Sequence, residues 1–253
     1  MSRFLPLLAV AVFVGCDSTG LDSDAPPTLI AQAAFDLDAD TFPENTARTS
    51  AAGANYANAA VRVGVVSAVV GANLALPLAA TAEAARATPV VTDGVWTWDA
   101  TADVFGTPVD LRLEASADGS DVTWRLISTR GGDDPGDSFT YVTATTSTDG
   151  QRGTWRLFHP DEAGPVLTAS FDVRNLDDRE ITFAVPSGLD NGGSSVRYAT
   201  DGDVKTFDWD DQPENDRALI EWDARSKAGS IEADTYNGGV RACWNAALND
   251  VTC

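Results

Sequence analysis

Six Asp-Gly or Asn-Gly pairs divide the sequence after residue 93, and they restrict the fold more than any other feature. The pairs begin at Asp93, Asp118, Asp149, Asn191, Asp201 and Asn237. These residue types tolerate the positive φ angles that tight hairpin turns require. Runs that alternate apolar and polar residues, such as Ile181-Phe183-Val185, lie between the pairs. The pattern predicts about ten to twelve antiparallel strands in an up-and-down meander.

The segment before these strands is rich in alanine and has a helical period. The stretch Thr41-Phe42-Pro43-Glu44 fits a capping box at a helix start. Further on, one apolar stripe recurs at steps of three and four residues: Tyr56, Ala59, Val63, Val66, Val70 and Leu74. Residues 41–88 are therefore predicted to form one long helix, or two helices interrupted near Gly71 to Pro77.

No charged residue occurs between Val63 and Ala82, so this run is long enough for a transmembrane helix. Asn73, Pro77 and many alanines make it only weakly apolar, and a helix that is apolar all round is otherwise a buried helix. We therefore expect the helix to pack against the sheet.

The predicted fold class is mainly β: an antiparallel meander over residues 89–253 forms a curved sheet or half-barrel, packed on the helical segment. Residues 41–253 are expected to form one structural unit. This architecture resembles the half-barrel of periplasmic lipoprotein carriers, without a shared residue motif, and so it implies no function.

The N-terminus has the pattern of an export signal. Arg3 precedes the apolar run FLPLLAVAVFVG, which ends at Cys16 and is too short to span a bilayer. The residues Phe13-Val14-Gly15-Cys16 resemble the lipobox of bacterial lipoproteins, with Phe13 in place of the preferred leucine. The resemblance implies that residues 1–15 are a signal peptide and that Cys16 becomes the lipidated N-terminus. An ordinary secretory signal with an incidental cysteine is the alternative.

Residues 16–40 are predicted to be a flexible tether, because DSTGLDSDAPPT is polar and contains Pro26-Pro27. The resemblance places the protein in the cell envelope, held by lipid outside the cytoplasm. Asp17 favours inner-membrane retention in enterobacterial lipoproteins, but other lineages follow other rules. We expect the outer membrane or the cell surface.

The formal net charge of −21 restricts the partners. Such an excess of acidic groups repels nucleic acid and anionic lipid headgroups, so neither is expected to bind. Two cysteines remain besides Cys16, namely Cys243 and Cys253. In an oxidising compartment this pair is predicted to form a structural disulfide.

Catalytic signals are absent from the sequence. His159 is the only histidine, and no nucleophile, zinc or phosphate-loop motif occurs. A hydrolase with paired carboxylates, Glu221 among them, is an alternative, but acidic residues are too common here for it to be specific. No cofactor is expected. The acidic run with Asp208, Asp210 and Asp211 is a candidate calcium site, although its spacing does not match an EF-hand and a solvated loop is the simpler interpretation.

All seven tryptophans occur at or after Trp96. Core packing is the simplest interpretation of them. Trp96, Trp98 and Trp124 are the candidates for lining a pocket between the helix and the sheet. The leading hypothesis is a non-catalytic envelope lipoprotein that binds an apolar ligand, such as a lipid, or a protein partner there. The alternatives are a carbohydrate-binding surface lipoprotein that takes a glycan on exposed tryptophans, a purely structural surface protein, and the hydrolase.

Overall fold

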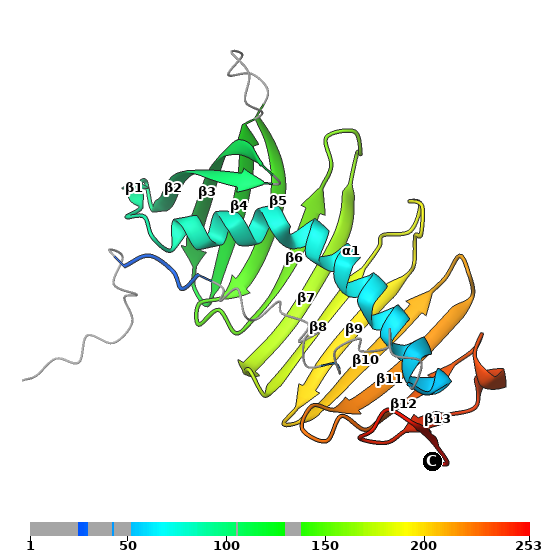
Figure 1. Ribbon diagram of the computed structural model, residues 1–253. Helices are drawn as coiled ribbons and strands as arrows, with labels where there is room; N and C mark the ends of the chain where they lie inside the picture. Colours follow the sequence, from blue (N-terminus) through cyan, green and yellow to red (C-terminus); the bar gives the residue numbers. More distant parts are fainter. Residues whose placement is uncertain (1–24, 30–41, 43–51, 105, 130–137) are drawn as a thin grey trace, which may run out of the picture.

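The computed structural model describes residues 25–29, 42, 52–104, 106–129 and 138–253. Its main element is one open sheet in which each strand pairs with the next strand of the chain, from β1 to β14. Each pair of neighbouring strands is antiparallel, which confirms the predicted meander. One helix, α1 (Ala54–Ala84), runs diagonally across one face of the curved sheet (Figure 1).

The first seven strands cover the half of the sheet nearest the C-terminal end of α1. They are β1 (Val90–Thr92), β2 (Val95–Val104), β3 (Thr107–Asp118), β4 (Asp121–Thr129), β5 (Ser138–Ser147), β6 (Arg152–Phe158) and β7 (Pro165–Asn175). The other seven are β8 (Asp178–Ala184), β9 (Ser195–Asp201), β10 (Val204–Asp211), β11 (Asp216–Asp223), β12 (Gly229–Ala233), β13 (Ala242–Trp244) and β14 (Asp250–Val251).

The Asp-Gly and Asn-Gly pairs lie between neighbouring strands, as the sequence predicts. At the first of them, Asp93 and Gly94 have φ angles of 52° and 76°, the left-handed backbone of a tight turn. The structure has more strands than the alternation indicates. The additional strands are short and lie at the edges, where β1 has three residues and β14 has two, because so short a run shows no measurable period.

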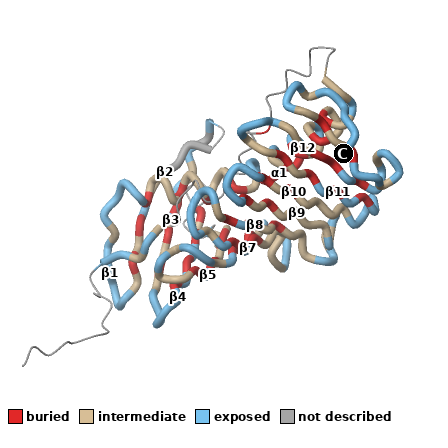
Figure 2. The backbone as a smooth tube through the Cα atoms, turned by 90° about the horizontal axis from the view of Figure 1, so that it is seen from below, coloured by how far each residue is buried: buried red, intermediate tan, exposed pale blue. Residues whose placement is uncertain are grey.

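The apolar core lies on the face of the sheet that α1 covers, which we call the inner face. Figure 2 shows buried positions alternating with exposed ones along the strands, because successive side chains of a strand point to opposite faces. One paired row crosses seven strands and alternates large and small side chains: Trp96, Ala115, Trp124, Ala144, Trp155, Ala169 and Phe183. The alanines leave room for the neighbouring rings, so the row fills space and lets the sheet curve.

The buried side of α1 is the stripe that the sequence indicates. Tyr56, Val63, Val70 and Leu74 are buried, and the stripe continues through Pro77, Ala80 and Ala84. The helix has no interruption near Gly71 to Pro77, which confirms a single helix, but it covers only Ala54–Ala84 of the predicted range 41–88. Pro77 is tolerated because it lies in the buried stripe of a helix that tertiary contacts hold in place. Thr41, Pro43 and Glu44 of the predicted capping box lie outside the described residues.

The N-terminus of α1 is capped by a residue from the far end of the chain. Gly53 at the cap position has no side chain to accept a hydrogen bond. Instead, the Ala54 and Asn55 amides donate to the two carboxylate oxygens of Asp250, at 3.1 and 3.0 Å. A Cβ on Gly53 would overlap that carboxylate, which explains the glycine. The negative charge also opposes the positive end of the helix dipole.

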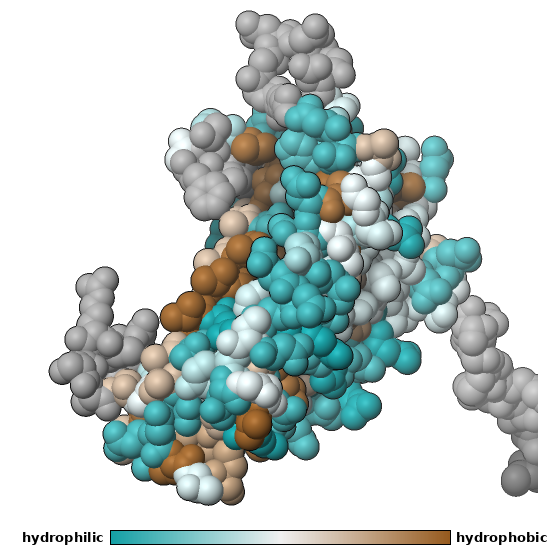
Figure 3. Space-filling model, turned by 90° about the vertical axis from the view of Figure 1, so that its right-hand side faces the viewer, coloured by the Kyte–Doolittle hydropathy of each residue, from teal (hydrophilic) through white to brown (hydrophobic). Residues whose placement is uncertain are grey.

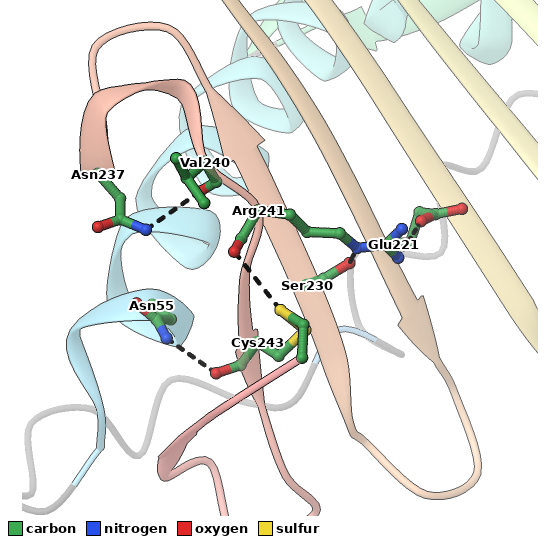
Figure 4. The surroundings of a disulfide bond; sticks show 8 residues. Asn55, Glu221, Ser230, Asn237, Val240, Arg241 and Cys243 are labelled. Carbon is green, nitrogen blue, oxygen red and sulfur yellow. Dashed lines mark hydrogen bonds and ion pairs between the residues drawn. A yellow bond between two sulfur atoms is a disulfide. The ribbon is translucent and has the colours of Figure 1, made fainter.

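A disulfide holds this capping loop closed. Cys243 and Cys253 are joined as predicted, and they enclose Asp250. Figure 4 shows the Asn55 side chain beside the bridge, where it donates to the Cys243 carbonyl at 2.8 Å. Nearby, Arg62 of α1 contacts the Asp216 carboxylate at 3.2 Å and the Thr235 hydroxyl at 2.9 Å. We call the loop 243–253 with these contacts the C-terminal clasp.

Replacement of Asp250 by alanine should lower the free energy of unfolding by about 0.5–2 kcal/mol, the usual cost of losing a helix cap. Urea denaturation followed by far-UV circular dichroism measures the loss. Glu232→Ala, an exposed acid on β12, is the matched control and should change stability by less than about 0.5 kcal/mol. Equal losses in the two variants would show that Asp250 does not cap the helix.

Candidate functional site

The candidate site is a pocket between the C-terminal half of α1 and the inner face of β3 to β6. Pro77, Ala80 and Thr81 line its helix side. The sheet side consists of apolar residues from four neighbouring strands: Leu113, Trp124, Leu126, Val142, Ala144 and Trp155. Thr81 is the one polar residue of this lining, and its hydroxyl donates to the Pro77 carbonyl at 2.8 Å. The pocket therefore offers almost no polar group to a ligand.

Leu29 completes the wall of this pocket and comes from the predicted tether. Its side chain is partly buried and packs against the core. The preceding residue, Thr28, lies next to Gly150 in the turn between β5 and β6. A short piece of the N-terminal segment thus docks on the sheet and puts one apolar side chain into the groove.

The space in the pocket that the centre of a water-sized sphere can occupy is small. It measures about 30 Å³, which is room for a water molecule or two and far less than the hundreds of Å³ of a typical ligand site. With Leu29 in its observed place, the pocket cannot admit a lipid chain. A ligand would have to displace that side chain.

The three tryptophans proposed from the sequence all lie on the inner face, but only Trp124 lines the pocket. Trp98 stacks on Trp124, with ring centroids 6.2 Å apart. Trp96 is buried beside this pair in the paired row and does not reach the pocket. The Trp124 indole N–H donates to the buried Thr146 hydroxyl at 2.9 Å, which fixes the orientation of the ring.

Sequence reasoning missed Trp155 and Leu29, which both line the pocket. The alternation around Trp155 resembles that around Trp124, so this position was detectable as inward-facing. No local pattern marks Leu29, since it stands alone in a polar tether. The remaining tryptophans also face inward, and none of the seven is more than partly exposed.

The inner face also holds two buried cations, Arg179 and Lys205, that no sequence pattern predicts. Arg179 on β8 places its guanidinium 5.7 Å from the centroid of the Tyr198 ring. Lys205 on β10 donates to the Gly202 carbonyl at 3.1 Å. Both belong to the half of the sheet away from the pocket, so neither supplies a charge to it.

The acidic run on β10 does not converge on a metal position. Asp208 and Asp210 point to one face of the strand, whereas Asp211 points to the other. Asp210 accepts a hydrogen bond from Gln212 at 2.7 Å and lies 3.7 Å from Arg217. Within the described parts of the chain, no group of three or more His, Cys, Asp or Glu side chains is placed to hold a metal ion.

Glu221 and His159, the two residues considered for catalysis, do not line the pocket. Glu221 lies on the outer face and is paired with Arg241 (Figure 4). His159 is exposed in the turn after β6, 3.6 Å from Asp161. Two further carboxyl groups have lowered pKa values: hydrogen bonds from Ser147 and Gln151 lower the pKa of Asp149, and those from Ser226 and Arg225 lower the pKa of Asp223. Lowered pKa values keep these carboxyl groups ionised, which is the opposite of what a general acid needs.

Comparison of the chain with models of protein families, with curated protein sequences and with solved structures finds no match. The function must therefore be argued from the chain's own residues.

Proposed function

We propose that the protein is a non-catalytic envelope lipoprotein that binds one apolar chain, such as a lipid acyl chain, in the pocket between α1 and β3 to β6. The observation that carries the proposal is the composition of the pocket wall. On the sheet side it consists of aliphatic side chains from β3, β4 and β5 and two indole rings, and the single hydroxyl of the wall is already hydrogen-bonded. Burial of an alkyl group against such a wall is favourable, whereas a polar group would find no hydrogen-bond partner there.

Leu29 supports the proposal because it shows what the groove accommodates. Its side chain is a branched alkyl group that enters the groove from a segment outside the sheet. An acyl chain that displaces Leu29 exchanges one set of methylene contacts for another, so the displacement costs little beyond the burial of that one side chain. The tether then has two roles: it links the protein to the membrane, and its Leu29 side chain fills the pocket as a plug.

A purely structural role is the second candidate, and the small free volume of the pocket favours it. If the inner face is simply a filled core, then removal of the plug creates a destabilising void and no binding site. The two candidates therefore make opposite predictions for the same substitution.

Leu29→Ala should strengthen the binding of a fluorescent fatty acid such as cis-parinaric acid by about tenfold, since burial of part of a leucine is worth about 1–2 kcal/mol. Fluorescence titration of the purified chain measures the dissociation constant. Leu176→Ala removes an exposed leucine from the turn after β7 and should leave binding unchanged. Absence of saturable binding in both the native chain and Leu29→Ala would refute the apolar-ligand proposal and favour the structural one.

The anchor is supported by the lipobox-like residues before Cys16, and its test is separate. Cys16→Ser should abolish the incorporation of labelled palmitate and release the protein from washed membranes, because no acyl chain remains to hold it. Arrest of processing by globomycin should accumulate the unprocessed form of the native chain. Labelling that persists in Cys16→Ser would show that this cysteine is not the lipidated residue.

A further inference from the structure

The outer side of α1, opposite its buried stripe, is apolar and exposed. Val61, Val65 and Val69 follow one another at four-residue steps, and their exposed fractions are 63%, 55% and 57%. The exposed residues between these valines are small, among them Gly64 and Ala68, so the valines form a ridge. In Figure 3 a brown ridge runs along the side that carries α1, next to a surface that is mostly teal.

Charge is distributed very unevenly around this ridge. The whole of α1 contains one cation, Arg62, and one anion, Glu83, in a chain whose net charge is −21. Arg62 points to the sheet, where it contacts Asp216. The outer face of the sheet instead carries charged side chains on strand after strand, for example Glu114, Glu180 and Arg197. Of the two broad faces, only the one with α1 can approach an apolar phase without desolvating many charges.

The docked piece of the tether places the membrane on that same side. Leu29 lines the same pocket as Pro77 and Ala80, so the N-terminal segment meets the body of the protein beside the C-terminal half of α1. From Ala25 back to Cys16 there are about nine residues, which span at most about 30 Å when fully extended. α1 itself is about 46 Å long. A lipid on Cys16 is therefore tethered within about 30 Å of Ala25, at the end of the body where the C-terminal half of α1 lies.

We propose that the valine ridge Val61-Val65-Val69 rests on the surface of the lipid bilayer when the protein is anchored, so that α1 lies in the membrane interface and the charged outer face of the sheet points away. The helix has the length and hydropathy of a membrane span, but its buried stripe is committed to the sheet. Only the outer side of α1 therefore contacts the bilayer, and the helix lies at the depth of the lipid headgroups, as interfacial helices do. The favoured surface is zwitterionic, since the acidic body is repelled by anionic headgroups.

This inference depends on the lipid anchor of the proposed function and is independent of the pocket. Its test uses the full-length, lipidated chain reconstituted into phosphatidylcholine vesicles, with an environment-sensitive fluorophore on Val65→Cys. The matched control carries the same fluorophore on Thr145→Cys, an exposed position on the outer face of β5. Mass spectrometry of the N-terminal peptide from the same sample establishes whether Cys16 is lipidated.

Nitroxide-bearing lipids should quench the Val65→Cys probe at least about twofold more than the Thr145→Cys probe, because an interfacial helix lies about 5–10 Å within the headgroup region. Addition of Val61→Asp and Val69→Asp should reduce the quenching to the control level, while far-UV circular dichroism stays unchanged, since both valines point away from the sheet.

Equal quenching of the two probes in a lipidated sample would overturn the bilayer contact and leave the anchor standing. An unlipidated N-terminus would overturn both. Disulfide-linked dimers through Val65→Cys, with no quenching, would show that a second copy covers the ridge and would refute the bilayer as its partner.

Discussion

The structure depends on the burial of one apolar sheet face by one helix. An open meander of fourteen strands has an inner face of tryptophans, phenylalanines and aliphatic residues, and among the described elements α1 is the one that crosses this face. Its stripe from Tyr56 to Ala84 supplies the second layer that every sheet needs. The sheet in turn supplies the tertiary contacts without which a 31-residue helix with Pro77 in it would be unstable. Neither layer is a stable structure alone.

The two ends of α1 are held in place by different kinds of contact. At the N-terminal end, Phe42 packs against Tyr56 and Trp222, and the C-terminal clasp supplies a cap, an ion pair and a disulfide. At the other end the helix covers the pocket, and the described contacts there are almost wholly apolar. Apolar contacts exchange partners more readily than a capped and cross-linked end does, so the pocket lies at the end of α1 where the packing can change more easily. The same C-terminal half lies beside the docked tether, which connects the pocket with the proposed membrane surface.

Much of this fold could be predicted from the sequence because its signals are local. The turn pairs, the strand alternation and the stripe on α1 each depend on residues close together in the chain. The helix cap could not be predicted, since Asp250 lies 196 positions after Ala54. The pairing of Trp124 with Ala144 and of Ala144 with Trp155 depends on strand register and bulges, which alternation does not specify. Alternation marks both Trp124 and Trp155 as inward-facing, but it does not show that register brings Trp155 to the pocket, and no local pattern marks Leu29.

The most direct test of the account compares two adjacent residues on opposite sides of α1. Val66 is 7% exposed and faces the sheet, whereas Val65 is 55% exposed and faces away. Urea denaturation should show that Val66→Asp loses at least about 3 kcal/mol of unfolding free energy, because an unpaired charge is forced into the core. Val65→Asp should change it by less than about 0.5 kcal/mol. Similar losses in the two variants, or a tolerated Val66→Asp, would contradict the claim that the burial of this stripe holds the fold together.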